Sequence, residues 1–127
     1  MTATSEMTGV QLFELFRKAC LSFTKPRSVS SDVLLQFGDK QALVRVREGR
    51  VAEVIESGVA FQSWDFAIKG SVEAWQKFWQ EIPPAGWHDI LALNKRKAFV
   101  IEGRLHPLMA HLQFYKDLLA SPRGMLR

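Results

Sequence analysis

The chain has 127 residues, of which 47% are hydrophobic and 24% are charged, so a chain that is disordered throughout is excluded. This length favours a single domain over residues 1–127, with residues 1–7 expected to be flexible. The formal net charge of +4 is modest, and the basic residues are scattered without a nucleic-acid-binding motif, so nucleic acid is not expected as a partner.

The single cysteine and the absence of long apolar runs indicate in which cellular compartment the protein is expected. Cys20 alone can form neither an internal disulfide nor a thiolate zinc cluster, which fits a reducing environment. The first ten residues do not resemble a secretory signal, and no apolar run approaches the roughly 20 residues needed to cross a bilayer. The expected location is the cytoplasm, with at most peripheral membrane contact.

The first predicted elements are a helix followed by three strands. The helix covers residues 8–23, where Phe and Cys residues recur with helical spacing before Lys25-Pro26. Strands over 32–37 and 41–48 are separated by three turn residues, and Glu48-Gly49 turns the chain into a third strand over 50–56. Hairpin-linked strands of this kind predict an antiparallel sheet.

The second half of the chain predicts two more strands and three helices. A strand over 63–70 leads to a helix over 71–82 that Ser71 caps, with Trp64, Phe66 and Ile68 on one strand face. A short helix begins at Asp89, a strand covers 98–103, and a final helix covers 107–120 with Pro107 in its first position. This order of elements predicts an α+β fold with helices on one face of the sheet.

No group of residues predicts a catalytic or a metal site. His106 and His111 would point about 140° apart on a helix, so they cannot share a metal, and they are interpreted as a boundary residue and a partly buried packing residue. Asp89 is interpreted as a helix cap preceded by His88, and Cys20 as a core residue. These residues therefore identify no reacting group and predict no metal and no cofactor, but taken alone they leave an enzyme open.

The aromatic content leaves two structures open. Nine Phe and four Trp either fill a plain core or line a hollow that an apolar ligand occupies. The pattern alone does not decide between the two.

Three segments between Val33 and Leu119 resemble the sterol carrier protein 2 (SCP2) family of lipid-binding domains. They are "VRVREGRVAEV", "WDFAIKGSVEAWQKFW" and "AFVIEGRLHPLMAHLQFYKDLL", which share the order and spacing of elements in that family. The resemblance implies a mostly antiparallel five-stranded sheet and an apolar cavity between sheet and helices that accepts a fatty acyl chain, a sterol or an isoprenoid. By position it implies a ligand-binding lining of Val44, Val46, Trp64, Phe66, Ile68, Trp75, Phe78, Trp79, Leu108, Met109, Leu112 and Tyr115.

One departure from the family concerns the rim of the cavity. Arg104 stands where the family often has an acidic residue, and with Lys95, Arg96 and Lys97 it could meet an anionic head group. The C-terminal "GMLR" also lacks the peroxisomal tripeptide, which favours a bacterial-type relative.

The first hypothesis is therefore a non-enzymatic domain that binds or transfers a lipid-like molecule. The alternative is a protein-interaction module with a closed cavity, which forms a homodimer or docks a partner enzyme of lipid or quinone metabolism through its last helix. A third hypothesis is an enzyme that uses His88 and Asp89, together with His106, in a lipid-handling cleft.

Overall fold

A computed structural model describes residues 8–21, 23–25, 27–56, 63–123 and 125; the predicted flexible segment 1–7 lies outside them. The described residues form an α+β structure, as predicted. Its elements in chain order are α1 (Gly9–Cys20), β1 (Ser31–Phe37), β2 (Lys40–Arg47), β3 (Arg50–Glu56), β4 (Phe66–Gly70), α2 (Val72–Phe78), α3 (Ile90–Lys95), β5 (Phe99–Gly103), α4 (Leu105–Ala110) and α5 (Leu112–Leu119).

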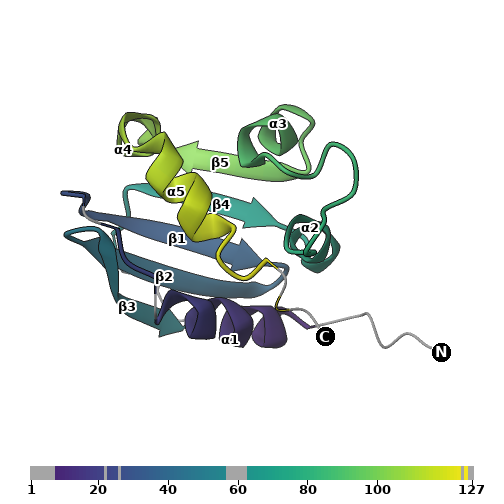
Figure 1. Ribbon diagram of the computed structural model, residues 1–127, viewed down its shortest axis with the longest axis horizontal. Coiled ribbons are helices and arrows are strands. Elements are labelled where there is room, and N and C mark those ends of the chain that lie inside the picture. The colour runs from purple at the N-terminus through teal and green to yellow at the C-terminus, as the bar shows by residue number, and fades with distance from the viewer. Residues whose placement is uncertain (1–7, 22, 26, 57–62, 124, 126–127) are drawn as a thin grey trace.

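The five strands form one sheet in the order β3-β2-β1-β4-β5, which Figure 1 shows as a layer behind α1 and α5. The pairs β1–β2, β2–β3 and β4–β5 are antiparallel, whereas β4 lies parallel to β1, with Val33 opposite Phe66. The sheet is therefore mixed, and the prediction of a mostly antiparallel sheet was wrong. Side-chain alternation identifies a strand and its buried face but carries no information on the direction of its neighbour.

All five helices pack against one face of the sheet, as predicted. The main core joins Leu12 and Phe16 of α1, Trp75 of α2 and Phe114 of α5 to strand residues such as Val44. Because α3 and α4 add Ile90, Leu93 and Leu108 to this same core, the helical layer extends across to β4 and β5.

Local sequence signals account for where several helices begin. Thr8 and Gln11 form a reciprocal capping box at the start of α1, with the Gln11 amide donating to Thr8 Oγ1 at 3.1 Å. Ser71 Oγ accepts from the amide of Ala74 at 3.0 Å, which confirms its predicted role as the cap of α2. Asp89 caps α3 in the same way, through the amide of Leu91.

The C-terminal helix differs most from the prediction. It breaks at His111, whose φ of −129° and ψ of 44° lie outside the helical region, so α4 and α5 are separate helices. Because α4 begins at Leu105, Pro107 is its third residue rather than its first. His111 is exposed instead of partly buried, since the break removes it from the stripe that it was predicted to share with Phe114.

Candidate functional site

Most of the predicted lining residues form the core of the domain. Nine of them are at most 2% exposed, namely Val44, Val46, Phe66, Ile68, Trp75, Phe78, Trp79, Leu108 and Tyr115. Their rings are in direct contact. The centroid of Trp75 lies 5.0 Å from that of Phe37, 5.1 Å from that of Trp79 and 4.7 Å from that of Phe99. The interior between sheet and helices is therefore well packed here, and ligand binding by these residues stays a prediction, as does the cavity itself.

The other three predicted lining residues lie elsewhere. Trp64 precedes β4 and packs with Leu34 and Leu43 on the face of the sheet opposite the helices, so it does not share a face with Phe66. Met109 is 54% exposed on α4, and Leu112 packs against the edge of the core while partly exposed.

A groove that the sequence did not predict lies between α1 and β3. A pocket of about 270 Å³ is lined from α1 and the residue after it by Arg17, Cys20 and Leu21, and from β3 by residues 51–54. An adjoining pocket of about 500 Å³ shares Leu21, Val51 and Ala52 with it and continues to Arg50. We call these two pockets together the α1–β3 groove.

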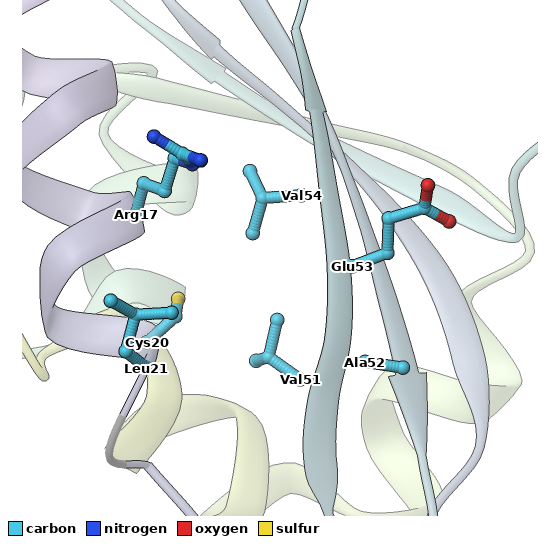
Figure 2. Close-up of a pocket in the computed structure, with 7 residues that line it drawn as sticks. All are labelled: Arg17, Cys20, Leu21, Val51, Ala52, Glu53 and Val54. Carbon is cyan, nitrogen blue, oxygen red and sulfur yellow. The ribbon is translucent and has the colours of Figure 1, made fainter.

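A β-bulge orients the valines of this groove. Val51 pairs with Val46 and Glu53 with Arg45, so Ala52 is an additional residue on β3. The bulge lets Val51 and Val54 face α1 although they are three residues apart, whereas Ala52 and Glu53 point away from it (Figure 2). The inner wall of the groove is therefore apolar on the strand side, and both valines pack against the main core.

On the α1 side of the groove, Cys20 is a buried apolar residue and Arg17 is an exposed cation. Cys20 is 2% exposed, and burial raises the pKa of its thiol above the ordinary range, so it is an apolar wall and not a thiolate. Arg17 is exposed and lies 3.6 Å from Glu14. Arg50 is exposed at the other end, so cations stand at both ends of the groove, and its apolar part is the wall that Val51, Val54 and Cys20 form.

The predicted head-group residues do not form one cluster. Arg104 follows β5 and pairs with Asp65, 3.0 Å from its carboxylate, whereas Lys95, Arg96 and Lys97 precede β5. The two groups therefore lie at opposite ends of β5. Because β5 and β3 are opposite edges of the sheet, neither group adjoins the α1–β3 groove.

The predicted acid–base residues are also dispersed. His106 is exposed on α4, while His88 and Asp89 line a separate pocket beside α3. No hydrogen bond joins the His88 and Asp89 side chains in the part of the chain that the structure describes, where no cluster of His, Cys, Asp and Glu could hold a metal either. Within the same residues, no helix has both the length and the apolarity needed to span a bilayer.

Comparison with known proteins identifies the kind of fold that the chain adopts. No family model matches the chain, and no curated protein does. Among solved structures, it is similar to one described as a UbiJ-SCP2 ubiquinone synthesis protein, with a TM-score of 0.53 and 10% sequence identity over 90% of this chain and 89% of the other. The chain adopts an SCP2-like fold, as its three motifs predicted.

Proposed function

We propose that the protein binds a lipid-like apolar molecule without chemical conversion, and that the molecule lies in the α1–β3 groove. The observation that carries this proposal is the groove itself. It opens on the helix-facing side of the sheet, between α1 and the edge strand β3, and is lined there by the partly exposed Val51 and Val54 and by the buried Cys20. The SCP2-like fold supports the same function by analogy.

The groove suits a chain-like ligand in size, and its valine wall suits one in polarity. One of its two pockets, about 270 Å³, lies just below the usual range for small-molecule sites, and the other, about 500 Å³, lies in the lower half of that range. Each methylene that leaves water contributes about 0.8 kcal/mol, so a chain of about ten methylenes provides several kcal/mol after ordering costs. Fatty acyl chains and isoprenoids share this chemistry, and the described role of the similar structure in ubiquinone synthesis makes isoprenoid quinones a class to include.

The experiment compares one valine of the groove with one exposed valine outside it. Val54→Asp places a carboxylate in the apolar wall, and Val100→Asp places the same group on β5, at the opposite edge of the sheet, where Val100 is 47% exposed. The delipidated chain is titrated with fluorescent fatty-acid and isoprenoid probes. We expect Val54→Asp to weaken binding by about tenfold or more and Val100→Asp to leave it unchanged, because only the first buries a charge against the ligand.

Circular dichroism establishes that both variants remain folded. If the wild-type chain takes up no probe at micromolar concentration, or if the two variants bind equally well, the proposal is wrong.

The packed interior favours a second candidate, the protein-interaction module. Trp75 and Trp79 close the space that the predicted cavity would occupy, and both are 0% exposed. Native mass spectrometry of freshly purified protein separates the candidates, since it reports bound lipid and subunit number together. A lipid adduct on a monomer supports the binding function, and a ligand-free dimer supports the module.

A further inference from the structure

A second pocket lies apart from the α1–β3 groove, where three helices and the C-terminal turn meet. It has a volume of about 280 Å³ and is formed by the end of α2, the start of α3, residues 113, 116 and 117 of α5, and Ala120 and Arg123 after it. It shares no lining residue with the groove. The binding function proposed above therefore does not use it.

Neutral groups hold the Arg123 side chain in this pocket. Its Nε donates to the carbonyl of Phe78 at 3.0 Å and its Nη2 to the carbonyl of His88 at 3.4 Å. The guanidinium also lies over the Phe78 ring, 4.8 Å from the centroid. Since a guanidinium carries five N–H donors, several remain available after these two bonds.

The other charged groups of the pocket already have partners. Lys116 lies 3.5 Å from Asp89, and Asp117 lies 3.8 Å from Lys25. Among the described residues, by contrast, Arg123 forms no ion pair. Its partial burial lowers the pKa of the guanidinium, since desolvation disfavours the charged form. An anion placed beside it would supply a compensating charge.

We infer that this pocket is a binding site for a small organic monocarboxylate, whose carboxylate accepts hydrogen bonds from the free donors of Arg123. The fork of a guanidinium matches the two oxygens of a carboxylate, and such charge-assisted bonds are among the stronger ones in proteins. The apolar body of the ligand meets Phe78, Ile90 and Ala120, which contribute to the same lining. Asp89 and Asp117 disfavour a dianion there.

The test is an amide NMR titration of the full-length chain with sodium benzoate. We expect saturable shifts at residues around the pocket at millimolar concentration. Arg123→Gln should weaken binding by about tenfold to a hundredfold, because a hydrogen bond to a charged group is lost. Arg27→Gln removes an exposed arginine outside the pocket and should have no effect.

A second variant keeps the inference testable if Arg123→Gln does not fold. Asp117→Asn removes a lining carboxylate and should tighten benzoate binding by about threefold, since less negative charge opposes the ligand. Absence of saturable shifts near the pocket overturns the inference, and so does unchanged affinity in Asp117→Asn. Inorganic phosphate binding as tightly as benzoate overturns the assignment to monocarboxylates.

Discussion

The indole nitrogen of Trp79 donates a hydrogen bond to the carbonyl oxygen of Leu119, and the two atoms are 2.7 Å apart. Leu119 is the last residue of α5, where backbone carbonyls lack partners within the helix. The bond therefore ties the end of α2 to the end of α5. The same ring stacks on Phe16 of α1 at an interplanar angle of 11°, so one side chain joins three helices.

Replacing this ring tests its contribution to stability. Trp79→Phe removes the donor and leaves the Leu119 carbonyl buried without its partner, which costs about 1–3 kcal/mol, and the smaller ring adds a cavity penalty. Urea unfolding followed by far-UV circular dichroism measures the loss. Trp87→Phe is the control, since Trp87 is only partly buried. Equal midpoints for the two variants would contradict the assigned role of Trp79.

The β2–β3 turn should tolerate substitution at one position and not at the next. Gly49 has a φ of 80°, and a Cβ there would lie 2.6 Å from the carbonyl oxygen of Arg27. Gly49→Ala should therefore lower the free energy of unfolding by about 2 kcal/mol or more. Glu48 has a φ of 53°, and Asn tolerates this region better, so Glu48→Asn should be neutral or slightly stabilising. Thermal unfolding of both variants checks the contrast; a milder effect at Gly49 than at Glu48 would refute it.

Stability should fall at alkaline pH because two buried groups resist losing their protons. Burial raises the pKa of Cys20 above its ordinary value of 9.0, and it also raises the pKa of Tyr115 above 10.0 despite the hydrogen bond between its hydroxyl and that of Ser31. Above these ordinary values the unfolded chain has lost protons that the folded chain keeps. Each group then destabilises the fold by up to about 1.4 kcal/mol per pH unit.

Urea midpoints between pH 7 and 10.5 measure this effect. Cys20→Ala should be less stable at pH 7, because it leaves a small cavity, but should show a shallower decline above pH 9. A decline as steep as that of the wild type would show that Cys20 does not contribute.

The sequence predicted the parts of this fold that depend on local spacing. Five strands and the caps at Ser71 and Asp89 follow from residues that are close in the chain. The parallel pairing of β1 with β4 does not follow from local spacing. It depends on which edge of the sheet formed by the first three strands β4 joins. The family resemblance predicted Met109 in the ligand wall, but it is 54% exposed on α4, because local spacing does not give the position of α4 relative to the sheet.

The candidate site was harder to predict than the fold. The α1–β3 groove depends on the single additional residue Ala52, which turns Val51 and Val54 to the same side. In the sequence, the only signal of this bulge is the spacing of three between the two valines of "RVAEVIE", which does not fit one face of a regular strand. That spacing, in a segment that follows a turn, could have indicated the bulge.

Two arginines could bind the anionic head group of a lipid: Arg17 in the α1–β3 groove and Arg104, which the sequence predicted at the rim of a cavity. Arg17 lies at one end of the α1–β3 groove, whereas Arg104 lies beyond β5 and is paired with Asp65. Arg17→Gln should weaken binding of a fatty acid by about threefold to tenfold and leave binding of a neutral isoprenoid alcohol unchanged, because only the acid interacts with the guanidinium. Arg104→Gln should change neither affinity. Fluorescence displacement titrations of both ligands measure these effects, and a loss of fatty-acid affinity in Arg104→Gln alone would place the head group at β5 and the ligand outside the groove.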